Sequence, residues 1–258
     1  MNDSARGMRV LVTAGAAGIG RAFAETFSNA GAKVFICDID RAALESLRSA
    51  RPEIGAGIAD VADARQVEGL FDAASSFLGG LDVLINNAGI AGPTGRVEDI
   101  SIADWDRTIA IDLNGMFYCT RLAVPLLKAA GGGSIINLSS VAGRLGFPLR
   151  TPYSAAKWAV VGFTKSLAME LGPDNIRVNA IQPGVVEGDR IERVISAKAK
   201  ALGESPDEIR RSMLSKVSLR RTVSPNDIAN MALFLATDAG RNISGQALSV
   251  CGNVEALV

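Results

Sequence analysis

Histidine is absent from this 258-residue chain, and tyrosine occurs only twice. Because histidine is the side chain that most often carries protons at neutral pH, few residues here could act as a general acid or base. Cysteine is also scarce: Cys37, Cys119 and Cys251 are an odd number and lack metal-ligand spacing. We therefore expect no metal site, and structural thiols in the reducing cytoplasm.

Excess charge and long hydrophobic runs are missing as well. The 27 basic residues equal the 27 acidic ones, which gives no electrostatic case for a nucleic-acid or anionic-membrane partner. No apolar stretch approaches the roughly 18 residues of a membrane helix, and residues 1–7 lack the hydrophobic segment of a signal peptide. Hydrophobic residues make up 48% of the chain. These features predict one cytoplasmic α/β domain over residues 1–258.

Short β-branched runs alternate with helical patterns along the chain. The expected strands are Arg9–Thr13, Lys33–Cys37, Val83–Asn86, Ser134–Leu138, Arg177–Ile181 and Ala247–Val250. The expected helices are Arg21–Ala30, Arg41–Ala50, Ala64–Phe77, Ile102–Ala129, Tyr153–Leu171 and Asp227–Ala236. This alternation predicts a doubly wound parallel sheet, in which ligands bind at the carboxyl ends of the strands.

Residues 188–221 interrupt the alternation, because they have helical spacing and no strand pattern. A capping box from Ser205 to Glu208, with Pro206 at the first helical position, predicts the start of a second helix there. We expect a helical lid over the site. The alternative is a helical insertion used for contact between subunits.

A glycine-rich turn, Thr13–Gly20, joins the first strand to the first helix. Backbone N–H groups at such a helix start bind phosphate. Eighteen residues after Gly20, the second strand ends at Asp38, where a carboxylate can accept hydrogen bonds from a ribose diol and would repel a 2′-phosphate. The pattern favours NAD over NADP. Asp38 could instead be a simple turn residue at the end of its strand.

Tyr153 and Lys157 stand four residues apart in the run Thr151–Lys157, on one face of a helix. A free tyrosine loses its proton only near about pH 10, but an adjacent lysine cation favours the phenolate. Tyr153 could then serve as a general acid or base. The bare YxxxK pattern also arises by chance on amphipathic helices, so its meaning depends on its surroundings.

Together these residues resemble the short-chain dehydrogenase/reductase family over nearly the whole chain. Thr13–Gly20 is similar to the family's glycine loop, residues 60–61 to its adenine-contacting pair, and residues 86–89 to its NNAG strand end. Asn114 matches its helix-bending asparagine and Ser140 its serine. The resemblance implies seven parallel strands, an alcohol–ketone oxidoreductase and, commonly, a homotetramer built on the long helices and the last strand.

The resemblance also implies residue roles. Tyr153 would take the hydroxyl proton, Ser140 would bond the substrate oxygen, and Lys157 would hold the nicotinamide ribose. Asn114 would bend its helix and seat a water. The residues assigned to the cofactor are Ala14, Gly15, Gly18, Ile19, Gly20, Asp38, Ile39, Asp60, Val61, Asn87, Ala88, Gly89, Tyr153, Lys157, Pro183, Gly184 and Val186.

Several positions depart from the family pattern. Ala14 occupies the first glycine position of the loop, which predicts a displaced or strained turn. Gly188 stands where threonine is frequent, Gln182 replaces an asparagine, and residues 251–253 replace Asp-Gly-Gly. These departures concern the cofactor geometry and the substrate pocket.

Arg144, Arg150 and Arg190 suggest an acidic substrate, such as a sugar acid or another small polar hydroxy compound, because guanidinium groups bind carboxylates. The alternative is that these arginines form structural ion pairs. Two other functions stay open: an NADPH-dependent 3-oxoacyl reductase, against which Asp38 argues, and a non-catalytic dinucleotide-binding protein. A methyltransferase would share the glycine turn but would not need Tyr153 and Lys157.

Overall fold

The computed structural model describes residues 4–257 and contains a seven-stranded parallel sheet in the order β3-β2-β1-β4-β5-β6-β7. The strands are β1 (Arg9–Thr13), β2 (Lys33–Asp38), β3 (Gly55–Ile58), β4 (Val83–Asn86), β5 (Gly133–Leu138), β6 (Ile176–Pro183) and β7 (Ala247–Val250). The predicted doubly wound parallel fold is confirmed. The chain reverses its direction of winding between β1 and β4, which is where such sheets bind ligands.

Nine α-helices flank the sheet in this part of the chain: α1 (Gly18–Asn29), α2 (Arg41–Ala50), α3 (Ala64–Leu78), α4 (Ile102–Ile109), α5 (Gly115–Ala129), α6 (Thr151–Leu171), α7 (Asp189–Leu202), α8 (Pro206–Ser215) and α9 (Pro225–Ala236). Short helical turns are η1 (Val97–Asp99), η2 (Ala110–Asn114), η3 (Val141–Gly143), η4 (Gly172–Asp174) and η5 (Asp238–Gly240). The expected single helix Ile102–Ala129 is therefore interrupted by η2, which is a π-helical turn.

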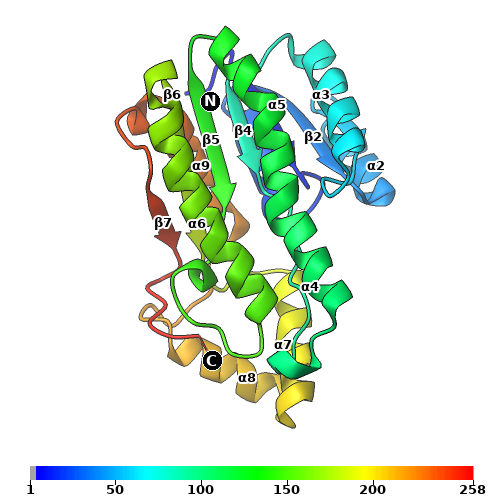
Figure 1. Cartoon of the computed structure of the whole chain (residues 1–258), viewed down its shortest axis with the longest axis vertical. Coiled ribbons are helices and arrows are strands. Elements are labelled where there is room, and N and C mark those ends of the chain that lie inside the picture. The colour runs from blue at the N-terminus through cyan, green and yellow to red at the C-terminus, as the bar shows by residue number, and fades with distance from the viewer. Residues whose placement is uncertain (1–3, 258) are drawn as a thin grey trace.

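Two hydrophobic clusters hold the layers together. Residues of α1, α2 and α9 pack on one face of the sheet, and residues of α3, α5 and α6 pack on the other. Figure 1 shows α5 and α6 side by side in front of the sheet, with α9 behind it. Because the strands are covered on both faces, they are apolar almost throughout, as the sequence predicted.

Strand β3 was not expected, because its sequence is Gly-Ala-Gly-Ile. A Cβ at Gly55 would lie 2.6 Å from Phe35 and 2.8 Å from Phe77, so the neighbouring aromatic rings leave no room for a side chain there. The close packing requires glycine in this strand. Because β-branched and aromatic residues are then missing, the sequence does not predict a strand here.

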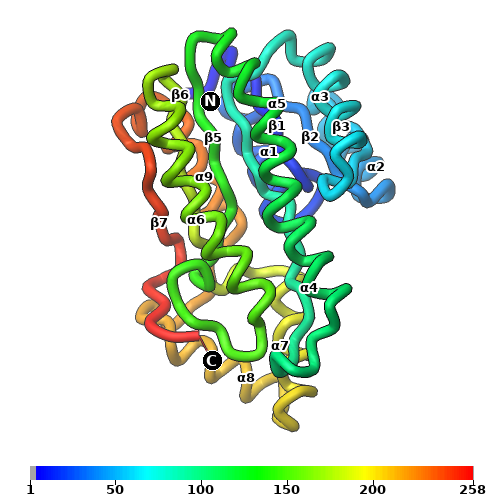
Figure 2. The backbone as a smooth tube through the Cα atoms, in the orientation of Figure 1, coloured from blue at the N-terminus to red at the C-terminus, as the bar shows by residue number. Residues whose placement is uncertain are grey.

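Helices α7 and α8 lie beyond the carboxyl ends of the strands, as Figures 1 and 2 show. The predicted capping box is present, since Ser205 accepts from the Glu208 N–H and the Glu208 side chain accepts from the Ser205 N–H. A third cluster joins these helices to Val141, Val185 and Cys251. The C-terminal segment completes it, with the Ser218 N–H donating to the Asn253 carbonyl. The insertion is thus packed over the end of the sheet where a lid was expected.

Candidate functional site

The glycine loop after β1 is tied to the loop after β4. Asn87 donates its amide to the carbonyls of Thr13 and Ala14, at 2.9 Å each, and the Thr13 hydroxyl accepts from the Asn87 and Ala88 N–H groups. A Cβ at Gly20 would lie 1.9 Å from the Ala14 carbonyl oxygen, so only glycine fits there. The two loops on either side of the switch point form one unit.

The start of α1 is open. Its N-cap residue, Ala17, makes no side-chain cap, and no acidic side chain occupies the first turn. Gly18 has φ +52°, and nothing lies within 4 Å of the position that a Cβ would take. Uncapped N–H groups next to open space suit a dinucleotide pyrophosphate. The loop therefore fits the cofactor that its sequence pattern indicated.

Ala14 has a left-handed backbone, with φ 50°. Residues with a Cβ rarely adopt this conformation, and glycine adopts it freely. The strain expected from the missing first glycine is present in the structure. Two hydrogen bonds nevertheless hold the turn in this conformation: the Asn87 amide donates to the Ala14 carbonyl, and the Gly15 N–H donates to the Cys37 carbonyl, both at 2.9 Å.

Asp38 lies beside the glycine loop, at the end of β2. One carboxylate oxygen accepts from the Ala16 N–H and the other from the Asp40 N–H, both at 3.1 Å. Ile39 is 63% exposed, and the Ala59 N–H donates to the Asp38 carbonyl, which brings Asp60 and Val61 to the same edge. The residues predicted to contact adenosine thus gather on one side of the loop.

Lys157 is held under the loop after β4. Its ammonium donates to the Leu138 carbonyl at 3.1 Å and lies 3.2 Å from a carboxylate oxygen of Asp112. The other Asp112 oxygen accepts from the Ile90 N–H at 2.6 Å. Lys157 is 4% exposed and Asp112 is fully buried. A Cβ at Gly89 would lie 3.2 Å from this ammonium, so the glycine lets the loop pass over the ion pair.

The role predicted for Asn114 needs correction. Asn114 is exposed at the end of η2, whereas Asp112, two residues earlier, faces Lys157. The π-helical turn adds a residue to the helix and so rotates the following positions relative to a regular α-helix. The regular α-helix is interrupted near Asn114, but a buried carboxylate occupies the interior position in place of an amide.

Tyr153 and Ser140 come from neighbouring segments. Tyr153 lies half-buried in the first turn of α6, with the Lys157 ammonium 5.5 Å from its ring centroid. Ser140 follows β5 and is 9% exposed; its hydroxyl oxygen accepts from the Ala142 N–H at 3.1 Å. The hydroxyl hydrogen of Ser140 therefore stays available to donate to a substrate oxygen.

The three arginines predicted to bind substrate have different surroundings. Arg144 donates to the Val254 carbonyl at 3.0 Å and so anchors the C-terminal segment. Arg190 is exposed and donates to the Gly89 carbonyl, beside the cofactor loop. Arg150 alone is buried near the tyrosine, with its guanidinium carbon 5.3 Å from the Tyr153 ring centroid. Burial lowers the pKa of Arg150.

Sequence reasoning missed Lys198, which lies on α7 and is 5% exposed. Its ammonium is 5.4 Å from the Phe147 ring centroid, and Arg150 contacts the same ring at 5.3 Å. Burial, followed by the charge of Arg150, lowers the pKa of Lys198. Lys198 belongs to a helical segment rich in charged residues, and such segments are usually exposed. The sequence therefore did not predict that this lysine is buried.

The remaining predicted cofactor residues follow β6. The Gly184 N–H donates to the Val250 carbonyl at 3.1 Å, and a Cβ at Gly184 would lie 2.7 Å from Cys251. Val186 pairs with Val223, which leads the chain to Gly188 at the start of α7. Gln182 accepts from the Ser249 hydroxyl and so joins β6 to β7. Pro183 and Gly184 end the strand at the same edge as Ser140.

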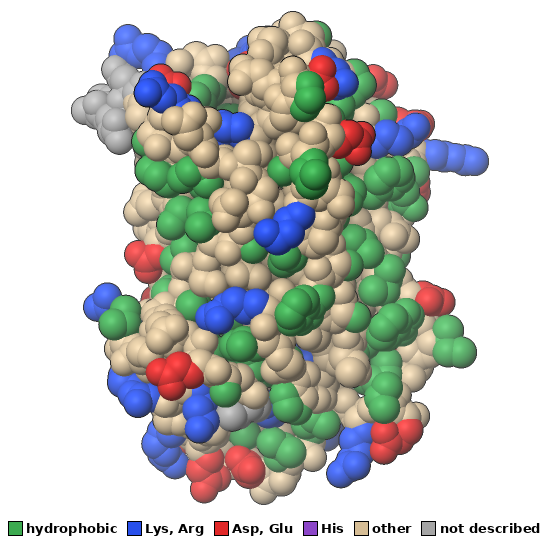
Figure 3. Space-filling model, turned by 60° about the vertical axis from the view of Figure 1, so that its left-hand side comes forward, with side chains coloured by type: hydrophobic (Ala, Val, Ile, Leu, Met, Phe, Trp, Pro, Cys, Tyr) green, Lys and Arg blue, Asp and Glu red, His purple; other side chains and the backbone are tan. Residues whose placement is uncertain are grey.

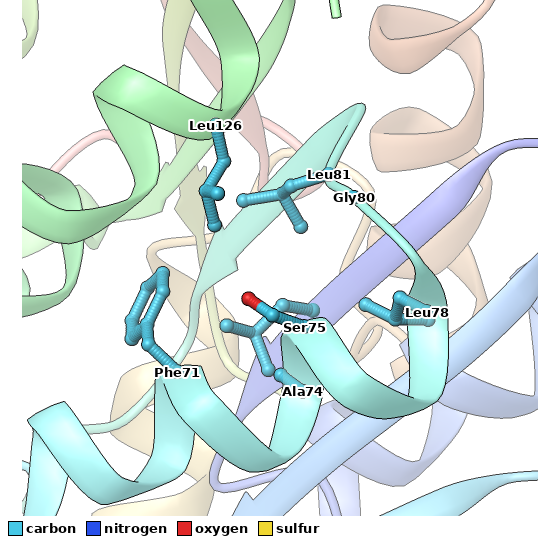
Figure 4. Close-up of a pocket in the computed structure, with 8 residues that line it drawn as sticks. Phe71, Ala74, Ser75, Leu78, Gly80, Leu81 and Leu126 are labelled. Carbon is cyan, nitrogen blue, oxygen red and sulfur yellow. The ribbon is translucent and has the colours of Figure 1, made fainter. Parts of the chain in front are cut away.

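A small apolar space elsewhere in the molecule offers no competing site. Figure 4 shows Phe71, Leu81 and Leu126 pointing toward one another between α3 and α5. Ser75 is the only polar side chain that lines it, and it lies near the amino end of β4, opposite the residues described above. We assign this space to packing.

Comparison with known proteins identifies relatives of this chain along most of its length. A family model described as enoyl-(acyl carrier protein) reductase matches residues 14–253. The chain is 39% identical to trans-4-hydroxycyclohexanecarboxylate dehydrogenase of Sinomonas cyclohexanicum, over 94% of this chain and 90% of that one. It is 38% identical to galactitol 2-dehydrogenase of Agrobacterium fabrum, over 94% and 95%. The crystal structure of NAD+-bound xylitol dehydrogenase superposes with a TM-score of 0.92 at 30% identity, over 96% and 98%.

Proposed function

The chain belongs to the short-chain dehydrogenase/reductase family, a family of nicotinamide-dependent oxidoreductases, and from that premise we propose that it interconverts a secondary alcohol and a ketone with NAD. The observation that carries the proposal is the placement of Tyr153 above Lys157, whose ammonium is fixed by Leu138 and Asp112. The proposed substrate is a small polar or acidic hydroxy compound, such as a polyol, a sugar or a sugar acid.

Each residue of the site has its own role in the proposed reaction. A bound nicotinamide would supply the acceptor for the hydride, with which the alcohol carbon gives up two electrons. Tyr153 takes the hydroxyl proton, and loss of the proton and the hydride together leaves a ketone. Ser140 donates to the substrate oxygen as negative charge develops on it. Lys157 would hold the nicotinamide ribose, and Asp112 holds this lysine in place.

Asp38 supports NAD as the cofactor. Its carboxylate already accepts from the Ala16 N–H of the glycine loop, and a 2′-phosphate beside it would meet a negative charge. The uncapped start of α1 and the space beside Gly18 would receive the pyrophosphate. NAD binding by the structurally similar xylitol dehydrogenase agrees with this assignment.

The names of the relatives support the substrate class. One relative is named for a hydroxycyclohexanecarboxylate and another for galactitol. Arg150, buried near Tyr153, gives the site a positive charge that suits an acid.

The second candidate is a reductase of acyl thioesters that uses NADPH. The description of the matching family model favours this candidate, since it names an acyl-carrier-protein reductase. Asp38 argues against NADPH. A non-catalytic dinucleotide-binding protein would have no use for a tyrosine, a serine and a buried lysine in this arrangement.

Titration of protein fluorescence with NADH and NADPH tests the cofactor assignment. We expect the wild type to bind NADH at least about tenfold more tightly, since like charges held close together repel. Asp38→Ala should shrink this preference. Asp38→Asn keeps an oxygen for the Ala16 N–H and removes the charge, so it should shrink the preference as well. Asp72→Ala, on the exposed face of α3, is the control. Equal or tighter NADPH binding by the wild type would favour the thioester reductase.

Two further properties are proposed from the family. We propose a homotetramer, because Phe117 on α5 and Trp158 and Met169 on α6 are large apolar side chains that are 49%, 51% and 83% exposed. Figure 3 shows hydrophobic side chains spread among charged ones over the face that it presents. We also propose a cytoplasmic location. No helix within residues 4–257 is long and apolar enough to cross a membrane.

A further inference from the structure

Two buried cations lie next to the proposed reaction centre. Arg150, just before α6, is 3% exposed, and Lys198, in the middle of α7, is 5% exposed. Both contact the ring of Phe147, at 5.3 and 5.4 Å from its centroid. The guanidinium carbon of Arg150 is also 5.3 Å from the Tyr153 ring centroid. The pair therefore joins the lid helix to the catalytic tyrosine.

Neither cation is paired with an acid. Among residues 4–257, no carboxylate forms an ion pair with Arg150 or Lys198, and the Lys198 ammonium and the Arg150 Nε have no hydrogen-bond acceptor. Within residues 4–257, the Arg150 guanidinium donates to the Ala91 carbonyl alone. The one buried carboxylate in the neighbourhood, Asp112, is engaged by Lys157. Glu204 and Asp112 attract Lys198 and Arg150, respectively, without forming ion pairs with them, so the protein offsets the positive charge of the two cations only in part.

Such an arrangement is unfavourable by itself. Burial of an ammonium group without a partner is costly, and the two cations at this ring also repel each other. The lowered pKa values of Lys198 and Arg150 express the same cost. An anion bound to both groups would supply the missing acceptor and further negative charge, because charge-assisted hydrogen bonds to a carboxylate are among the strongest in proteins.

We infer that Arg150 and Lys198 form a carboxylate subsite, so that the substrate is a small hydroxycarboxylate bound with its hydroxyl group at Tyr153 and its carboxylate against these two residues. The inference rests on the proposed function, and it adds the lid residue Lys198 to the binding site. It also gives α7 a role, because the carboxylate would bind to the helix that covers the site.

Binding without turnover tests the subsite directly. Thermal unfolding would be followed with cyclohexanecarboxylate and, in parallel, with the neutral cyclohexanecarboxamide, each with and without NADH. The wild type should be stabilised by the carboxylate and much less by the amide. Lys198→Met should lose this difference, Lys198→Arg should keep most of it, and Lys200→Met, on the exposed side of the same helix, should behave as wild type. Without ligand, Lys198→Met should unfold at the same or a higher temperature, since it removes an unpaired buried charge.

Kinetics give a second readout. The ratio of kcat/KM for trans-4-hydroxycyclohexanecarboxylate to that for its primary amide should fall by about 10- to 100-fold in Lys198→Met, which is the value of one charge-assisted hydrogen bond. Lys200→Met should keep the wild-type ratio.

The outcomes separate the two proposals. Carboxylate binding that depends on Lys198, without oxidation of any alcohol, would support the subsite and overturn the proposed function. Oxidation of neutral alcohols with no preference for the carboxylate would support the function and overturn the subsite. A carboxylate preference that survives in Lys198→Met would also overturn the subsite.

Discussion

At the scale of single residues, the ion pair between Asp112 and Lys157 organises the reaction centre. Both groups are buried, and each makes a second contact with the backbone, to Ile90 and Leu138. A buried charge that keeps its partner and its hydrogen bonds is tolerated, whereas one that loses its partner is not. The position of the lysine beneath Tyr153 thus depends on an acid that is remote in the sequence.

Replacing Asp112 by alanine should lower the free energy of unfolding by about 3 kcal/mol, because it leaves the Lys157 ammonium buried and unpaired. Urea unfolding measures this change. Asp112→Asn is the matched control: its amide oxygen can still accept from Ile90 or face Lys157, so we expect less than half of the loss. An unfolding free energy for Asp112→Ala equal to that of the wild type would show that the pair does not stabilise the fold.

Ala14 provides a stability prediction of the opposite sign. Its φ of 50° is unfavourable for a residue with a Cβ by about 1–2 kcal/mol, and glycine would remove this strain while gaining freedom in the unfolded chain. We expect Ala14→Gly to raise the unfolding free energy by about 0.5–1 kcal/mol. Ala16→Gly, in the same loop but without positive φ, should lower it. If both substitutions lowered the unfolding free energy, the claim that the Ala14 backbone is strained would be wrong.

Some site residues could be predicted from the sequence and others could not. Spacing predicted Asp38 at a strand end and Tyr153 and Lys157 on one face of a helix, and the family resemblance pointed to Ser140. Asp112 could not be predicted, because the resemblance pointed to an asparagine and so to Asn114, whereas the structure brings the Asp112 carboxylate to Lys157. Lys198 could not either, because its burial arises from packing between α7 and the segment before α6.

At the scale of elements, the lid depends on the ends of its helices. The capping box of α8 satisfies N–H groups at Ser205 and Glu208, and α8 packs against α7, which carries Lys198. The capping box could be predicted because it depends on four consecutive residues. Strand β3 could not be predicted, because Gly55 is required by the rings of Phe35 and Phe77, which are distant in sequence.

Removal of the α8 cap should loosen the lid locally. Ser205→Ala should cost about 1 kcal/mol, which corresponds to roughly fivefold faster hydrogen exchange within residues 206–215. Ser196→Ala, at an exposed position within α7, is the control and should leave exchange in α8 unchanged. Exchange in α8 that is as slow in Ser205→Ala as in the wild type would show that packing alone fixes the helix.

At the scale of the whole molecule, the two faces of the sheet have different surroundings. On the α1, α2 and α9 side, Phe234 is 40% exposed, whereas α5 and α6 together carry three large apolar side chains that are 49–83% exposed. An exposed tryptophan, phenylalanine and methionine on adjacent helices are typical of an interface between subunits. The site itself is built within one chain, at one end of the sheet.

The proposed tetramer predicts that Trp158→Glu dissociates the protein, because burying a charge in an apolar interface is unfavourable. Sedimentation velocity should give the mass of four chains for the wild type and a smaller species for the variant. Val97→Glu, at an exposed apolar position outside α5 and α6, should stay tetrameric. A wild type that sediments as a monomer at micromolar concentration would contradict the proposal.

The most direct measurement of the central claim is the rate of NAD-dependent oxidation by Tyr153→Phe, with the alcohol or hydroxycarboxylate that the wild type oxidises fastest. Phenylalanine keeps the ring that Arg150 and Lys157 contact and removes only the hydroxyl group. We predict that kcat falls by about 10²- to 10⁴-fold while NADH binding is retained, and that Tyr118→Phe, the change at the other tyrosine, has no such effect. A Tyr153→Phe rate within tenfold of the wild type would contradict the assignment of Tyr153 as the general acid/base.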